Sequence, residues 1–427
     1  MRVDNDYSND VRHTIPKPSR NVPSFAQSAL RAVIPGFKRK PANALGSGGT
    51  VVDISRLEDR LVIQSTADDP DARETKRLSA LALELADAAA WVELADYFIE
   101  LEATRATLPS GTRAVEAVLA ELREALSTGH LTPSDIRNDI SYDIPAATLD
   151  MIELILKNND ENYMLAALLA RLHLDCAWSM RGTEPWEKLD KVTLKLMRDH
   201  SNLIHDLVTV YDPIAYESPL LAEVQYSLAV FQRRDLSRVR VAFDDWIELD
   251  PGNPTLYRTH AFSLQSHYAH EDPNVVENEA RRAMTLMETP SAQPYMTMYA
   301  TALPMSEVHF SKVDHALFAQ GFEDALSGQK TSSLRLVHLL ADVVQCFPDE
   351  QSEQAHAAPR AAREMSGFVR SNLAPTVRTH LKTLYRSAWN HPEEDFLRAV
   401  APAFAKELAE GSRVTLNDDG LGISNPN

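Results

Sequence analysis

Proline residues place the helices of this chain in pairs. Four dipeptides have the form of a helix start: Ser218-Pro219, Asn253-Pro254, Asp272-Pro273 and Gln293-Pro294. In three of them a side chain that can cap a helix precedes a proline, whose fixed φ and missing N–H suit the first helical position. Asp235 adds a cap between the first two starts. Helices that begin near 219, 236, 254, 273 and 294 predict two-helix units that recur about every 35 to 40 residues.

Apolar side chains follow one face of each of the first three predicted helices. The three stripes are Leu221, Val224, Leu228 and Phe231; Leu236, Val239, Phe243 and Trp246; and Tyr257, Ala261, Leu264 and Tyr268. This spacing is typical of an amphipathic helix. Because one such helix pair cannot bury its apolar face alone, the pattern predicts that the pairs stack on one another.

Between 219 and 288 the chain resembles a tetratricopeptide repeat. The likeness is carried by Phe243 and Leu249-Asp250-Pro251 at the end of a second helix, and by the small residues Ser227 and Ala261 in first helices. Trp246 departs from the family, which usually has alanine there, and predicts wider spacing between helices. The resemblance implies a right-handed helical-hairpin solenoid. It also implies that a protein or peptide binds in a concave groove lined by the first helices.

The whole chain predicts an all-α protein, because Val51-Val52 and Leu61-Val62-Ile63 are too short to indicate strands. Helices are predicted at 146–157, 161–180 and 185–210, and Thr132-Pro133-Ser134-Asp135 predicts another helix start. Composition divides the chain into five parts: a disordered basic arm at 1–53, a helical region at 54–210, the helical repeats at 211–350, C-terminal helices with a basic face at 351–411, and a polar tail at 412–427.

Charge is unevenly distributed along the chain. The formal net charge is −18, yet residues 1–50 carry eight Lys and Arg against three Asp, a net of +5. The remaining residues therefore carry −23, and this acidic field argues against binding of nucleic acid over the whole surface. The basic arm could fold back on the acidic body or reach an acidic partner.

Cysteine usage and hydropathy indicate the compartment. Cys176 and Cys346 lie in apolar helical runs without the spacing of metal ligands, which favours reduced core residues of a cytosolic protein. The N-terminus lacks the apolar core of a signal peptide, and no stretch approaches the roughly 18 apolar residues of a membrane span. These features predict a cytoplasmic protein with no membrane partner.

The most suggestive surface lies near the C-terminus. Between His356 and His391 there are six Lys and Arg and one Glu. A helix that begins at Pro375 would gather five side chains on one face: Arg378, Lys382, Tyr385, Arg386 and Trp389. Cations interleaved with aromatic rings suit an acidic protein segment or a nucleic acid. The competing interpretation is a solvated face whose cations pair with acidic neighbours at 393–395.

A second candidate surface contains two histidines. His260 and His267 are seven residues apart on a predicted first helix and so share a face. We expect them to line the groove that a bound peptide would occupy. Two imidazoles at this spacing form a poor chelate, and no third ligand completes a zinc pattern, so no metal site is predicted. The Gly46–Thr50 segment lacks the Lys-Ser/Thr pair of a phosphate loop, so no nucleotide cofactor is predicted either.

Two functional classes remain. The repeats favour a non-enzymatic scaffold or adaptor that binds another protein, and self-association is compatible with that role. The alternative is an enzyme with a site within 72–210, where His173, Asp175 and Cys176 form a compact polar trio on an otherwise apolar helix. We expect that cysteine to be a core residue, and no catalytic residue is predicted. A nucleic-acid-binding regulator that uses the basic face at 360–389 is a further alternative.

Overall fold

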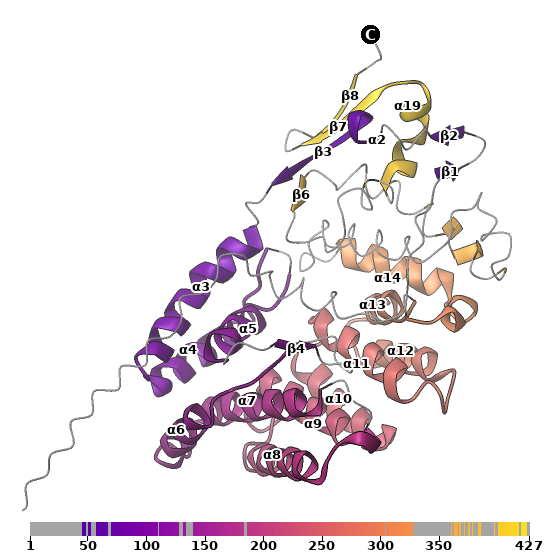
Figure 1. Cartoon of the computed structure of the whole chain (residues 1–427). Coiled ribbons are helices and arrows are strands. Elements are labelled where there is room, and N and C mark those ends of the chain that lie inside the picture. The colour runs from indigo at the N-terminus through magenta and orange to yellow at the C-terminus, as the bar shows by residue number, and fades with distance from the viewer. Residues whose placement is uncertain are drawn as a thin grey trace, which may run out of the picture.

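A computed structural model describes residues 45–47, 50–52, 57–66 and 70–327, parts of 360–400, and residues 401–424, with short gaps at 110, 128–130, 134–139, 183–185, 304 and 418–419. Most of these residues are helical, as predicted (Figure 1). The long helices are α3 (Pro70–Asp87), α4 (Trp91–Ala103), α5 (Ala114–Leu126), α6 (Ala146–Lys157), α7 (Tyr163–Arg181), α8 (Lys191–Val210), α9 (Pro219–Phe231), α10 (Leu236–Leu249), α11 (Pro254–His267), α12 (Val275–Thr285), α13 (Gln293–Ala302) and α14 (His315–Ser327).

Capping side chains begin three of these helices where the sequence predicts them. Each of the three helices has a side-chain oxygen that accepts a hydrogen bond from a backbone N–H of its first turn. The oxygen belongs to the Ser218 hydroxyl in α9, the Asp235 carboxylate in α10 and the Asn253 amide in α11. Helix α12 begins at Val275 instead of Pro273. The reason is that Asp272 organises a turn ahead of the helix, in which its Oδ1 accepts the N–H of Asn274 at 2.8 Å.

Helices α7 to α14 pack as consecutive pairs. Helix α7 packs against α8, α9 against α10, α11 against α12, and α13 against α14. The first members also meet one another, because α7 contacts α9 and α11 contacts α13. Every residue of α7 from 164 to 178 is buried, whereas α8, α10 and α12 bury only one face. The first helices are therefore inner helices, and the second helices are amphipathic outer ones.

Aromatic rings fill the interface of α9, α10 and α11. Trp246 and Tyr226 lie 5.5 Å apart between ring centroids, and Phe243 stacks on the imidazole of His260 at 3.7 Å. All four side chains are buried. The stripe predicted for the second helix, which contains Phe243 and Trp246, therefore faces the core.

A small sheet brings together segments from the two halves of the chain. Its strand order is β6 (Thr383–Tyr385), β3 (Leu61–Thr66), β7 (Arg413–Asn417) and β8 (Gly420–Ser424). Strand β3 runs parallel to β6 and β7, and β7 pairs antiparallel with β8. In Figure 1 the indigo strand β3 lies beside the yellow strand β7, although the two come from opposite ends of the chain.

This sheet corrects three predictions. Residues 61–66 are a strand, the segment predicted as a helix through 389 contains strand β6, and the polar tail at 412–427 contains β7 and β8. Leu61, Ile63, Val414 and Leu416 alternate with less buried neighbours and are buried together. Their partners are about 350 residues away in sequence. A local sequence pattern cannot reveal strand pairing between segments that are so far apart. The short apolar run at residues 61–63 therefore predicts no strand when it is considered by itself.

Two short hairpins lie outside the helix pairs. Strand β1 (Leu45–Ser47) pairs with β2 (Thr50–Val52), inside the predicted disordered arm at 1–53. The other residues of that arm lie outside the described residues. Strand β4 (Leu131–Pro133) pairs with β5 (Ile140–Tyr142), so the helix start predicted at Thr132-Pro133 is wrong. The described residues also contain five very short helical segments: α2 (Leu57–Arg60), η2 (Trp186–Lys188), η3 (Glu307–Ser311), η5 (Ala401–Phe404) and α19 (Ala405–Ala409).

The aromatic interface generates a test of the core. Truncation of Phe243 or Trp246 to alanine should lower the free energy of unfolding by about 3–5 kcal/mol, because each leaves a cavity in a packed core. Urea denaturation measures the loss. Val241→Ala on the exposed face of α10 is the matched control and should change stability by less than about 0.5 kcal/mol. Equal stability of Phe243→Ala and Val241→Ala would contradict the packing.

Candidate functional site

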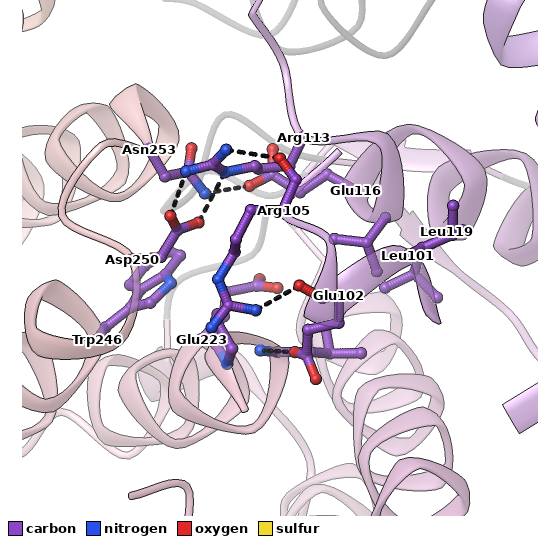
Figure 2. Close-up of a pocket in the computed structure, with 13 residues that line it drawn as sticks. Leu101, Glu102, Arg105, Arg113, Glu116, Leu119, Glu223, Trp246, Asp250 and Asn253 are labelled. Atoms are coloured by element: carbon purple, nitrogen blue, oxygen red, sulfur yellow. Dashed lines mark hydrogen bonds and ion pairs between the residues drawn. The ribbon is translucent and has the colours of Figure 1, made fainter. Parts of the chain in front are cut away.

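A cavity lies where α4 and α5 meet the helix pairs, and charged side chains surround it (Figure 2). Its charged lining comes from both sides of the junction: Glu102, Arg105, Arg113, Glu116, Glu223 and Asp250. The cavity has a volume of about 30 Å³. That volume holds one or two water molecules, whereas pockets for organic ligands usually reach several hundred Å³.

Arg113 and Asp250 form the central ion pair of the junction. Arg113 precedes α5, and Asp250 ends α10. The Arg113 Nε donates to Asp250 Oδ2 at 2.9 Å, and Nη2 donates to Oδ1 of the same carboxylate. The remaining Arg113 Nη1 donates to the carbonyl oxygen of Arg105 at 3.0 Å. Because the pair is bidentate and buried, it fixes both the distance and the orientation of the two segments.

Two glutamates of the N-terminal helices hold the first turns of inner helices. Glu102 Oε1 in α4 accepts from the Ser218 hydroxyl at 3.0 Å and from the Leu220 N–H at 2.8 Å, at the start of α9. Glu116 in α5 accepts from the Asn253 amide at 2.6 Å and the Thr255 hydroxyl at 3.0 Å, at the start of α11. Carboxylates are favourable at helix N-termini, where backbone N–H groups are unsatisfied.

The pKa of both carboxyl groups is raised. Burial is the main cause in each case, and the hydrogen bonds from Ser218 and Leu220, or from Asn253 and Thr255, only partly oppose it. Raised carboxyl pKa values in a cleft can indicate acid–base catalysis. Here the oxygens that would act are already engaged by donors from the helix starts, so the arrangement favours a structural role.

A second buried network continues from the cavity into the core. Arg123 of α5 donates twice to Asp175 of α7, at 2.7 and 2.6 Å. Arg171 donates to the same carboxylate at 3.4 Å and to Glu223 of α9 at 2.6 Å. Positive and negative groups thus alternate from α5 through α7 to α9. Each buried charge has an opposite partner, which compensates for the cost of removing it from water.

These contacts explain how the inner helices are covered. Helix α4 packs on α7, hydrogen bonds attach α4 and α5 to the starts of α9 and α11, and the Arg113–Asp250 ion pair attaches the start of α5 to the end of α10. In the tetratricopeptide resemblance, the first helices line an open groove. Here α7 is packed against the chain's own N-terminal helix α4, and Glu102 of α4 is bound at the start of α9.

The structure places His260 in the core. Its Nδ1 lies 3.0 Å from the Tyr226 hydroxyl, its ring stacks on Phe243, and its Nε2 lies 3.4 Å from Glu279. No part of the side chain is exposed, and burial lowers its pKa. This placement is inconsistent with the predicted contact between His260 and a bound peptide. The sequence missed the burial because a packed second helix covers the face that His260 shares with the apolar stripe.

His267 lies at the end of α11 and is partly buried. Its Nε2 has no hydrogen-bond partner among the described residues. Burial and the nearby charges of Arg233 and Arg181 lower its pKa to about 4. His267 and His260 are therefore not brought together into one accessible site, although both remain on α11.

Arg378 does not lie on a free cationic face. Its guanidinium donates to the Ala403 carbonyl at 2.7 Å and to both oxygens of Glu407 at 2.6 and 2.7 Å, and it lies over the ring of Phe404. Of the other predicted members, Tyr385 belongs to strand β6. Lys382, Arg386 and Trp389 lie outside the described residues. Arg378 therefore pairs with an acidic residue, as the competing interpretation predicted. That residue is Glu407 of α19 and not one of residues 393–395.

The polar trio of α7 does not form a catalytic group. Asp175 pairs with Arg123, His173 Nδ1 lies 2.7 Å from His200 Nδ1, and the Cys176 thiol points to the carbonyl of Ile144. Burial raises the pKa of Cys176 to about 11, so the thiolate is disfavoured. Cys176 is buried, as expected for a core cysteine. Three neighbours in sequence thus have three separate partners.

The ionic junction was missed by sequence reasoning. In the sequence, Asp250 belongs to the Leu249-Asp250-Pro251 turn that closes a repeat. The turn before Arg113 has no pattern that predicts an ion pair. A usable signal was present in α7, where Arg171 and Asp175 interrupt a run of apolar residues. Charges at such positions are rarely left unpaired in a core, so they predict buried partners.

Comparison of the chain with protein-family models, with curated proteins and with solved structures found no match. Among the described residues, no group of three or more His, Cys, Asp or Glu side chains is placed to hold a metal ion. In the same part of the chain, no helix has the length and apolar character needed to cross a bilayer.

The junction can be tested by removing one member of its central pair. Asp250→Ala should destabilise the protein by about 3–5 kcal/mol, because it leaves the Arg113 guanidinium buried without its carboxylate. Chemical denaturation measures the change. Glu74→Ala, which breaks the exposed Arg77–Glu74 pair, is the matched control and should leave stability close to that of the parent, because water screens an exposed pair. If Asp250→Ala matched that control, the junction would not hold the helices together.

The lowered pKa of His267 predicts acid sensitivity. Above pH 6.5 the ring is neutral in both states, whereas between pH 6.5 and about 4 the unfolded chain binds a proton that the folded chain does not. Stability must therefore fall as the pH falls through this window. His267→Gln should remove up to about 2 kcal/mol of the parent's loss between pH 7 and pH 5, measured by urea denaturation. His270→Gln removes an exposed imidazole nearby and should follow the parent.

Proposed function

We propose that this protein is a non-enzymatic helical-repeat scaffold that binds another protein. The observation that carries the proposal is the series of helix pairs from α7/α8 to α13/α14, with buried inner helices and half-exposed outer helices. A series of this kind supports a solenoid of the sort that the tetratricopeptide resemblance implies. Stacked helical pairs present an extended surface, which suits recognition of a protein segment.

The binding surface that we propose is the outer one. Helix α4 packs on the inner helix α7, and Glu102 and Glu116 hold the starts of α9 and α11, so a partner would meet α10 and α12 instead. Ion pairs make α10 and α12 a continuous surface: Arg240 pairs with Glu279 at 2.6 Å and Arg282 with Asp244 at 2.5 Å. Val241 is 61 % exposed on α10 and offers an apolar contact there.

The enzyme alternative has less support. The cavity at the ionic junction has room for water only, and its carboxylates are engaged by helix starts. The trio at His173, Asp175 and Cys176 is divided among three partners. A free and buried Cys176 is also in keeping with the reducing, cytoplasmic compartment that we propose. The pairing of Arg378 with Glu407 removes one cation from the proposed nucleic-acid face.

Affinity capture with matched variants tests the scaffold role. The parent protein, Val241→Glu and Leu81→Glu are used to capture proteins from the native cell extract, and an enriched protein is then purified and its affinity measured directly. Leu81 is exposed on α3, outside the helix pairs, so Leu81→Glu is the control. We expect Val241→Glu to weaken binding severalfold and Leu81→Glu to leave it unchanged, with equal melting temperatures. Absence of any direct partner, or equal binding by both variants, would contradict the proposed surface.

A further inference from the structure

Helix α8 exposes apolar side chains that nothing in the described chain covers. Val192, Leu196 and Val210 are 68 %, 43 % and 69 % exposed. At about 100° per residue, Leu196 lies roughly 40° from Val192, and Val210 returns to the same line five turns later. The stripe therefore runs along the whole solvent side of the helix. In Figure 1, α8 lies at the lower edge of the molecule, away from α13, α14 and the sheet.

The stripe has the spacing of a helix–helix seam. Between Val192 and Val210 the positions on this line are Leu196, Asp199, Leu203 and Asp206, so the steps alternate between four and three residues. Alternating steps of this kind align one helix with another along its length. Asp199 and Asp206 are exposed at two of the seam positions. A partner helix that places a cation next to Asp206 would compensate one of these two charges.

Helix α8 itself carries such cations, all in its N-terminal half. Lys191, Lys195 and Arg198 are exposed, and Lys195 lies about 60° from the line of the seam. From residue 199 to 217 the chain has Asp199, Asp206, Asp212 and Glu217 but no Lys or Arg. The exposed side of α8 is thus basic at its start and acidic at its end and beyond.

We propose that two copies of this chain pair through α8, antiparallel across a twofold axis. Antiparallel pairing places the basic half of each helix against the acidic half of the other, whereas parallel pairing would place like charges together. When Val192 of the first copy faces Val210 of the second, Leu196 of the first copy faces Asp206 of the second. Lys195 of the first copy then lies next to that Asp206 carboxylate. Each contact occurs twice, as a twofold interface requires. The occupant of the seam is therefore a second copy of the same surface.

The size of the surface determines the strength expected of this dimer. Helix α8 has 20 residues and is about 30 Å long. A single helix pair of that length buries less than the roughly 1,200 Å² of a stable complex, so the dimer is reversible and depends on protein concentration. Self-pairing through α8 goes beyond the proposed scaffold role and does not depend on it, since it uses no residue of α10 or α12.

Engineered cysteines test the antiparallel register. Val192 and Val210 are 18 residues apart, about 27 Å along one helix, so cysteines at both positions cannot join within one chain. Under mild oxidation, the double variant Val192→Cys/Val210→Cys should give a closed covalent dimer on a non-reducing gel. Each single variant should stay at the level of the parent, whose Cys176 and Cys346 define the background. Three results would overturn the proposal. They are cross-linking of Val192→Cys alone, covalent oligomers larger than a dimer from the double variant, and no covalent dimer from the double variant.

Charge reversal supplies a second measurement that needs no cross-link. Sedimentation velocity should show a parent dimer that grows with concentration. At the concentration where half of the parent is dimeric, Lys195→Glu or Asp206→Lys alone should lower the dimer fraction. The combined Lys195→Glu/Asp206→Lys chain should recover it, because each swapped charge again meets an opposite one. Both substitutions are on exposed positions, so the circular dichroism of all three variants should be unchanged. A monomeric parent, or a double variant as weak as the singles, would overturn the proposal.

Discussion

The buried ion pair between Arg113 and Asp250 is the interaction on which the arrangement of this protein depends. Removing two charges from water is costly, and the cost is offset only when geometry is close and every remaining donor is used. Arg113 meets both conditions, since its third nitrogen bonds the Arg105 carbonyl. Glu102 and Glu116 add bonds to the starts of α9 and α11. Together these contacts define where α4 and α5 lie on the helix pairs.

The position of the N-terminal helices determines which helix faces remain accessible to a binding partner. In a bare stack of helix pairs, the inner helices would line a groove. Here α4 packs on α7, and the polar network from Arg123 to Glu223 joins α5 to α7 and α9. The outer helices keep one side in water as a result. This is why the proposed partner surface lies on α10 and α12, and why α8, with its apolar stripe and divided charge, is open to a second copy.

Local sequence was sufficient for most helices. Ser218, Asp235 and Asn253 predicted three helix starts because a cap needs only the next two or three residues. The helix predicted at 146–157 spans the same residues as α6. The site was harder to predict. Asp250 was noticed only as a turn residue, because its partner Arg113 lies 137 positions away, and Glu102 gave no signal within α4.

The sequence by itself determined the helical class, the caps and the paired helix starts, because these depend on contacts between residues a few positions apart. Only the tertiary structure decided which faces are covered. His260 had the spacing of a groove residue, yet α10 and Glu279 enclose it. Leu61 and Val414 became strand residues because they are paired across about 350 positions. Whether a residue is buried or paired in a sheet depends on the segments that pack against it. In this protein those segments are distant in sequence, and hydrophobic contacts and compensated charges hold them in place.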